Sequence, residues 1–266
     1  MRGRWAPWQT KSVAGKTRKR WLIAAGFVLV VLGATVVVVF LLYRDKATPV
    51  GQEDVAGTLV TGDGRPGDYG LYAYTTTGFE TTDAFAGSRH DYPAETYLTI
   101  QPGGCGTLVR WQPLEERWDE WDYCADATLA GWLSFHKWFG VPNHEDWTCT
   151  PPLPTRAEPG ALWSGDCEHA EGANAAGVVE TQYYEVVGFE TLTVGGEPAE
   201  TIHIRNTSEG NSASTAADSS DTWILAGTLL IVRQVTADNS VTPTPIGPVT
   251  YHEEYQIDLV SLYPAG

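Results

Sequence analysis

Positive charge is scarce over most of this chain. Beyond Lys46 the sequence holds eight Lys or Arg residues, and the only lysine among them is Lys137. The whole chain has 33 acidic residues, of which Asp45 alone precedes this part, so the net charge here is 8 − 32 = −24. Nucleic acids and anionic lipid headgroups attract basic surfaces. The deficit therefore argues against nucleic acid as a partner, and we interpret the acidity as a source of solubility.

Sequence motifs of known catalytic chemistry are also missing. The chain contains no G-x-S-x-G, no H-E-x-x-H and no G-x-x-x-x-G-K-[ST], the patterns of serine hydrolases, zinc peptidases and phosphate-binding loops. No C-x-x-C or H-x-x-x-H spacing joins His136 or His144 to the cysteines in a metal site. These absences predict a protein that is not an enzyme and that holds neither cofactor nor metal.

Titratable side chains cluster at three places, and we interpret each cluster as surface charge. The acids of LEERWDEWD, residues 114–122, could act as an acid–base pair of the glycosidase kind. Alternation along a hairpin, however, distributes them over both faces next to a turn. His90 with Asp91, and His252 with Glu253, have no nucleophile that the sequence places within reach.

A long apolar run is the clearest feature that is present. Residues Trp21–Tyr43 contain no charge, and at about 1.5 Å per residue a helix of this length spans a hydrocarbon core of roughly 30 Å. Seven Lys or Arg and no acid precede it within the first twenty residues, which keeps this end cytoplasmic. The predicted order is a basic tail (1–20), a transmembrane signal-anchor helix (21–43), a linker (44–68) and an extracytoplasmic β domain (69–266).

A cleaved signal peptide is the alternative for this run. Its apolar region would cover about 7–15 residues and end at a small-residue cleavage site. Here the run is longer and is followed by Arg44-Asp45-Lys46. We therefore expect a single-pass protein of the cell membrane with its C-terminal domain outside the cytoplasm.

All four cysteines lie in the exported part, and an even number in an oxidising compartment predicts two disulfides. A hairpin over residues 105–124, centred between Leu114 and Glu115, pairs positions whose numbers sum to 229. This register sets Cys105 against Cys124, Trp111 against Trp118, Leu108 against Trp121, and Arg110 against Asp119. Such aromatic, apolar and ionic pairs each stabilise a hairpin by roughly 0.2–1 kcal/mol. We therefore expect Cys105 to bond Cys124 and Cys149 to bond Cys167.

Two stretches of the chain resemble one another. GFETTDAFAGSRHDYPAET, residues 78–96, and GFETLTVGGEPAET, residues 188–201, both follow an aromatic strand-like segment and both precede a GTL sequence, at 106–108 and 227–229. The shared order suggests an internal duplication with repeat-like halves at about 69–150 and 178–263. Chance similarity of two hairpins is the alternative.

Strand patterns occupy most of the exported domain. Segments such as AETYLTI, TIHIRNT and VTYHEEYQIDLVSL alternate or run apolar over strand lengths, between clusters of Gly, Pro, Asn and Asp. DTWILAGTLLIVRQV is typical of two strands joined at Ala226-Gly227, and LAGWLSFHKWFG fits a strand bounded by Gly131 and Gly140. The linker has room for a short first strand. We predict an all-β antiparallel domain, either a bent half-barrel or a two-layer sandwich.

The stretches GFETTDAFAGSRHDYPAE, GCGTLVRWQPLEERWDEWDYC and FHKWFG resemble those of uncharacterised single-pass membrane-anchored proteins of high-GC Gram-positive bacteria. DTWILAGTLLIVRQV and the final strand are more weakly similar to the curved half-barrel sheets of the LolA and LppX lipoprotein-handling proteins. That second resemblance implies an extracytoplasmic bent antiparallel sheet whose concavity carries lipids or lipidated proteins.

Tryptophan is concentrated in one part of the exported domain. Of the eight tryptophans after the membrane segment, seven fall within residues 111–163. They fill a core or form a binding surface, since tryptophan is common in both. The predicted ligand-binding residues are Trp118, Trp121, Trp132, Trp138 and Phe139.

The function that these features favour is non-catalytic binding of an apolar or lipidic ligand at the cell envelope. A protein or glycan interaction module is the alternative and predicts exposed coplanar tryptophans without a cavity. An envelope hydrolase is the third hypothesis, and it needs two carboxylates or a histidine-based dyad that converge in a cleft.

Overall fold

The computed structural model describes residues 44–57, 59–85, 87–153, 157–169, 179–210, 215–216, 218–244 and 247–265. The predicted basic tail and membrane helix lie outside these residues. Within the described ranges, no helix is both long and apolar enough to cross a membrane. Residues 45–266 form one compact unit.

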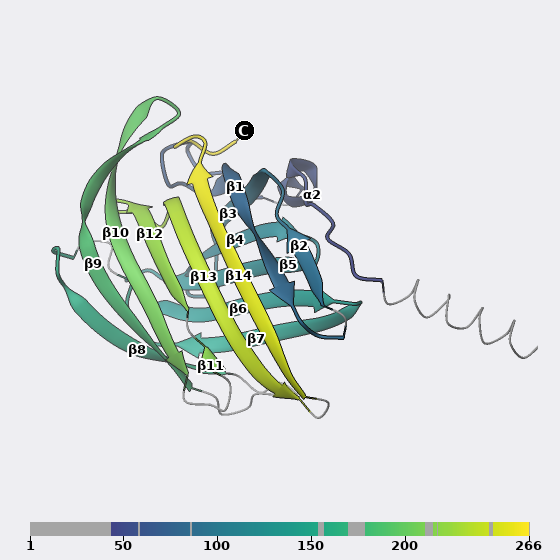
Figure 1. Ribbon diagram of the computed structural model, residues 1–266. Coiled ribbons are helices and arrows are strands. Elements are labelled where there is room, and N and C mark those ends of the chain that lie inside the picture. The colour runs from purple at the N-terminus through teal and green to yellow at the C-terminus, as the bar shows by residue number, and fades with distance from the viewer. Residues whose placement is uncertain are drawn as a thin grey trace, which may run out of the picture. The chain divides into compact units, whose positions relative to one another are not determined.

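The compact unit is all-β with one short helix, α2 (Gln52–Ala56) (Figure 1). In place of the short first strand expected in the linker, this segment holds α2 and a single bridge from Pro49 to Leu114. The strands are β1 (Gly70–Thr82), β2 (Ser88–Asp91), β3 (Glu95–Pro102), β4 (Gly106–Leu114), β5 (Arg117–Cys124), β6 (Leu129–Trp138), β7 (Val141–Cys149), β8 (Leu162–His169), β9 (Val179–Val194), β10 (Glu197–Gly210), β11 (Thr215–Ala216), β12 (Ser219–Leu225), β13 (Ile231–Thr244) and β14 (Gly247–Leu259).

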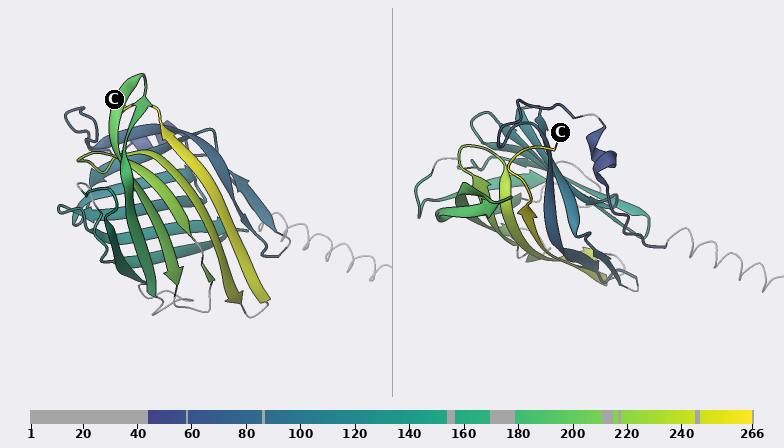
Figure 2. Two further views of the ribbon diagram at one scale, coloured as in Figure 1. Left: turned by 60° about the vertical axis from the view of Figure 1, so that its left-hand side comes forward. Right: turned by 90° about the horizontal axis from the view of Figure 1, so that it is seen from above.

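Twelve of these strands form a closed antiparallel barrel, in the order β1-β3-β4-β5-β6-β7-β8-β9-β10-β12-β13-β14 and back to β1. Figure 2 shows the sheet from two further sides. β2 pairs with β1 and β11 with β13, so both lie off the barrel.

The expected half-barrel or sandwich is therefore wrong in one respect, because the sheet closes. β14 pairs with β1 from Tyr74↔Leu259 to Thr82↔Tyr251, and with β13 from Arg233↔Asp258 to Thr244↔Gly247. An open sheet would leave one edge of these long strands with unpaired N–H and C=O groups, which closure removes.

A core fills the end of the barrel at which β1 begins and β14 ends. Its members come from the paired ends of neighbouring strands and include Tyr74 of β1, Leu98 of β3, Trp111 of β4 and Ile257 of β14. The Trp111 indole donates a hydrogen bond to the Thr96 hydroxyl at 3.0 Å, so its polar atom is satisfied although the residue is 1% exposed. Aromatic side chains thus close one end of the barrel by burial.

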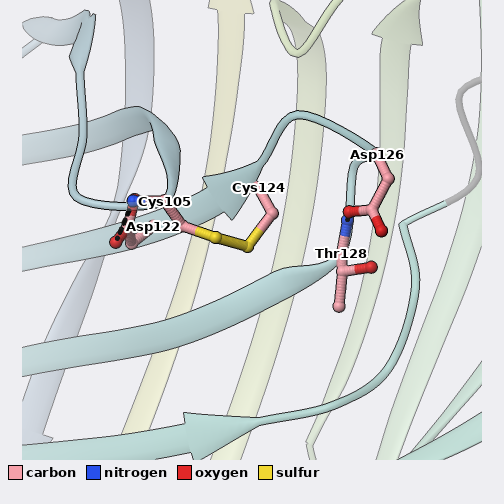
Figure 3. The surroundings of a disulfide bond; sticks show 5 residues. All are labelled: Cys105, Asp122, Cys124, Asp126 and Thr128. Atoms are coloured by element: carbon pink, nitrogen blue, oxygen red, sulfur yellow. Dashed lines mark hydrogen bonds between the residues drawn. A yellow bond between two sulfur atoms is a disulfide. The ribbon is translucent and has the colours of Figure 1, made fainter.

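Both predicted disulfides are present, Cys105–Cys124 and Cys149–Cys167. Figure 3 shows the first, with Asp122 accepting a hydrogen bond from the Cys105 amide at 3.3 Å. The predicted hairpin register is nevertheless wrong by one residue. The observed pairs are Gly106↔Cys124, Val109↔Trp121 and Trp111↔Asp119. A shift of one residue exchanges the two faces of a strand, so Trp111 enters the core whereas Trp118 points outward.

The two GFET stretches occupy different pairings. In the first, the PAET segment returns to the part of β1 before GFET, with Tyr74↔Thr96. In the second, PAET pairs with GFET itself, with Thr201↔Glu190. Gly78 has φ +147°, and a Cβ added there would lie 2.3 Å from the Glu254 carbonyl oxygen, whereas Gly188 has open space. Internal duplication stays a hypothesis. The two glycines differ in that only Gly78 lies too close to a neighbouring strand to carry a side chain.

Candidate functional site

A cavity of about 1190 Å³ lies inside the barrel beside the core. Side chains alternate between the two faces of each strand, so the inward-facing residues line either this cavity or the core. Ligand pockets commonly measure about 300–1,000 Å³. The space is therefore large enough for a molecule of lipid or drug size.

Aromatic and aliphatic side chains form one side of the cavity, which we name the aromatic wall. Trp132 and Trp147 stack with their ring centroids 5.8 Å apart and their planes 15° apart. They pack against the Cys149–Cys167 disulfide. The wall consists of Trp121, Tyr123, Leu129, Trp132 and Trp147, all of which line the cavity.

Carboxyl groups form a second side, which we name the acidic wall: Glu145, Glu180, Asp218 and Asp238. The Ser208 hydroxyl donates to Asp218 at 2.9 Å. Asp218 in turn lies close enough to Glu180 and Asp238 to shift their pKa values. One carboxyl oxygen each of Glu180, Asp218 and Asp238 has no hydrogen-bond partner among the residues that the structure describes. Within the described ranges, no group of His, Cys, Asp or Glu side chains is arranged to hold a metal ion.

Burial raises the pKa values of two residues of the acidic wall, Glu180 and Asp238. Loss of solvent raises the pKa of Glu180 to about 7, and the charge of Asp218 adds to the effect. The pKa of Asp238 is raised well above its usual range, again by burial first and by Asp218 second. Glu180 and Asp238 thus retain protons at pH values where solvent-exposed carboxyl groups would release them.

Replacing Glu180 with glutamine is expected to stabilise the protein at alkaline pH. A carboxyl whose pKa rises on folding, here from 4.5 to about 7, costs stability as the pH rises between these values. The variant should therefore be more stable than the wild type by about 3 kcal/mol at pH 8 and nearly equal to it at pH 4. Urea unfolding at both pH values measures this, and a variant that is less stable at pH 8 would contradict it.

Arg117 also lines the cavity, and its charge is already paired within the protein. It is 3% exposed, donates to Asp119 at 2.6 Å and to Glu253 at 3.1 Å, and Tyr92 also donates to Glu253. The interpretation of Glu253 as surface charge is therefore wrong, since this residue is buried with a cationic partner.

Three side chains form a hydrogen-bonded series beside Arg117. Ser134 Oγ lies 3.0 Å from His136 Nε2, and His136 Nδ1 lies 2.9 Å from Glu80 Oε2. Burial acts to raise the pKa of Glu80, but hydrogen bonds from His136 and His90 outweigh it and lower the pKa to about 2. An ionised Glu80 makes Nδ1 the protonated nitrogen and leaves Nε2 to accept from the serine. This is the geometry of an acyl-transfer triad.

Lys137 follows Ser134 at the S-x-x-K spacing, but it does not join this series. The two residues belong to β6, where positions an odd number apart point to opposite faces. Ser134 and His136 line the cavity, and Lys137 does not. A serine–lysine pair of the penicillin-binding kind is therefore excluded here.

His90 is buried, so its interpretation as surface charge is also wrong. Nδ1 lies 2.7 Å from Glu80 and Nε2 lies 3.0 Å from Asp45, while the ring stacks on Trp138 at 4.0 Å. Burial acts to lower the pKa of His90, but the two carboxylates raise it overall. Asp45 also accepts from the Phe139 amide. The linker is thereby attached to the wall of the barrel.

The predicted ligand-binding residues divide between the two faces of the sheet. Trp121, Trp132, Trp138 and Phe139 line the cavity. Trp118 lies on the outer face, where it stacks on the Phe135 ring with 5.5 Å between centroids. The prediction omitted Trp147 and the whole acidic wall. Alternation along β7 could have placed Trp147 inside with Cys149, but the acidic residues belong to strands far apart in the sequence.

Comparison with known proteins adds little. No protein-family model matches the sequence, and no curated protein matches it. Among solved structures, the hypothetical lipoprotein YmcC from Escherichia coli is similar with a TM-score of 0.33 and 10% identity, over 68% of this chain and 85% of that one.

Proposed function

We propose that this protein is a non-catalytic binding protein of the cell envelope, which holds an apolar or lipidic ligand inside its barrel. The observation that supports this most directly is the cavity of about 1190 Å³ with its aromatic wall. A closed sheet keeps such a ligand away from water on all sides of the barrel, and aromatic residues supply most of the apolar contact area in ligand sites. The membrane anchor predicted from residues 21–43 would keep this site at the envelope.

Native mass spectrometry of the full chain, purified from membranes with disulfides intact, tests this function. We expect extra mass that extracts into organic solvent. Trp132→Ala should lose most of it, because this side chain lines the cavity, whereas Trp118→Ala on the outer face should retain it. Wild-type protein without bound mass, and without binding of the neutral probe N-phenyl-1-naphthylamine, would contradict the proposal.

The second candidate function is acyl hydrolysis, which only the Ser134–His136–Glu80 series favours. In such a reaction the serine oxygen attacks an ester carbonyl carbon, His136 passes the proton to the departing alcohol, and water then releases the acyl group. Ser134 is 2% exposed, which fits a structural hydrogen bond better than a nucleophile.

A fluorophosphonate probe separates the two candidates. Because we propose binding without catalysis, we expect no covalent labelling of the full chain. Ser134→Ala is the matched control, since it removes only the hydroxyl. Labelling of the wild type that disappears in this variant would establish a reactive serine and replace the binding function with hydrolysis.

A further inference from the structure

Acidic side chains outnumber basic ones in the lining of the cavity. Among the described residues, six carboxyl side chains line it, Asp119, Glu145, Glu180, Asp218, Asp238 and Glu253, together with a single Lys or Arg side chain, Arg117. Arg117 is paired with Asp119 and Glu253. Within the described ranges, none of the four carboxyl groups of the acidic wall forms an ion pair.

Glu180 gives a second and independent indication of a ligand. The residue is 6% exposed, it lines the cavity, and within the described part of the chain its Oε1 has no hydrogen-bond partner. A buried polar atom without a partner is costly, and a buried carboxylate without a counter-charge more so. A positively charged donor inside the cavity would satisfy this oxygen and the unpaired oxygens of Asp218 and Asp238 together.

The acidic wall is continuous with the aromatic wall. Glu145 precedes Trp147 by two residues on β7, so both point to the same face. Glu180 pairs across β9 and β8 with Cys167, which is bonded to Cys149 and packs with Trp147. One molecule can therefore contact carboxyl groups at one end and stacked indole rings along the rest.

We propose that the ligand is a cationic amphiphile, whose ammonium group binds the acidic wall while its apolar chain lies on the aromatic wall. This inference rests on the proposed function and names the ligand class. An anionic lipid is disfavoured because it would place negative charge beside four carboxyl groups that no Lys, Arg or His neutralises within the described ranges. Indole faces next to the acidic wall add attraction for a cation.

Three eight-carbon probes that differ only in their headgroup test the ligand class: octylamine, octanol and octanoate. Each is titrated by calorimetry at pH 8 into the full chain in nanodiscs, with empty nanodiscs as the blank. We expect octylamine to bind at least tenfold more tightly than octanol, and octanoate to bind most weakly. Equal affinities for octylamine and octanol would overturn the headgroup inference but leave the proposed function. Absence of binding by all three would overturn both.

Glu180→Gln and the control Glu168→Gln complete the test. Glu168 lies on the neighbouring strand β8, is exposed and does not line the cavity, so the control makes the same change of charge elsewhere. We expect Glu180→Gln to weaken octylamine binding about tenfold and to leave octanol binding unchanged, and the control to change neither. Because Glu180→Gln is expected to stabilise the fold, its loss of affinity cannot be attributed to unfolding. An unchanged octylamine affinity in both Glu180→Gln and Asp238→Asn would overturn the inference.

Discussion

Replacing Arg117 with methionine is expected to lower the free energy of unfolding by about 3–5 kcal/mol, the usual cost of removing one partner from a buried ion pair. The guanidinium contacts Asp119 and Glu253, and its Nε lies 3.9 Å from Glu80. All four residues are almost fully buried. Methionine retains much of the side chain's apolar volume. The lost free energy of unfolding therefore reflects the missing positive charge, which leaves the three carboxyl groups without their cationic partner.

Urea unfolding of the full chain, followed by tryptophan fluorescence, measures this effect. Arg205→Met is the control, because Arg205 is 47% exposed and its ion pairs with Asp221 at 3.2 Å and Glu185 at 3.8 Å are surface contacts, each worth at most about 1 kcal/mol. The triple variant Arg117→Met, Asp119→Asn, Glu253→Gln should recover part of the stability by removing the unpaired charges. Equal costs for Arg117→Met and Arg205→Met would show that the buried cluster does not stabilise the barrel.

Gly78→Ala is expected to destabilise the protein by a similar amount, about 3–5 kcal/mol. Single substitutions cost this much when they cause severe backbone strain or overpacking. The alanine Cβ would lie 2.3 Å from the Glu254 carbonyl oxygen and 2.6 Å from Tyr255 Cα, at a φ of +147° that L residues rarely adopt. These atoms belong to β14, so relief of the clash requires β1 and β14 to separate where the barrel closes.

Gly188→Ala is the matched control for this prediction, because Gly188 is the corresponding glycine of the second GFET stretch. No neighbouring atom lies within 4 Å of the position of its Cβ. We expect a change below about 1 kcal/mol, in either direction. If the two variants were equally stable in a thermal unfolding experiment, closure at Gly78 would not require glycine.

Local patterns predicted the elements of this fold well. Both disulfides, the strand nature of β6 and the turn between β12 and β13 followed from alternation, spacing and glycine positions. Closure did not, because β1 and β14 pair through residues at the two ends of the domain and nothing local marks that pairing. The β4–β5 register was missed by one residue because several cross-strand pairings of Trp, Arg and acid satisfy the same rules.

The candidate site was predicted only on the side where its residues are close in sequence. Trp121 and Trp132 belong to neighbouring hairpin strands, so one tryptophan-rich segment indicated the aromatic wall. Glu180, Asp218 and Asp238 come from separate parts of the chain and converge only after the barrel closes. Their burial beside one another cannot be inferred from composition, because the sequence beyond Lys46 holds many other acidic residues.

The pairing of β1 with β14 also sets an order of events during folding. β3 to β10 pair mainly with their neighbours in the sequence, so these hairpins can form while the chain is still being synthesised. β1 cannot complete its pairing until β14 arrives, nearly two hundred residues later. Throughout that interval it presents an open hydrogen-bonding edge of the kind that joins other chains. The time needed to deliver the last strand is therefore the period in which a nascent molecule is most exposed to aggregation and to misassembly with its neighbours.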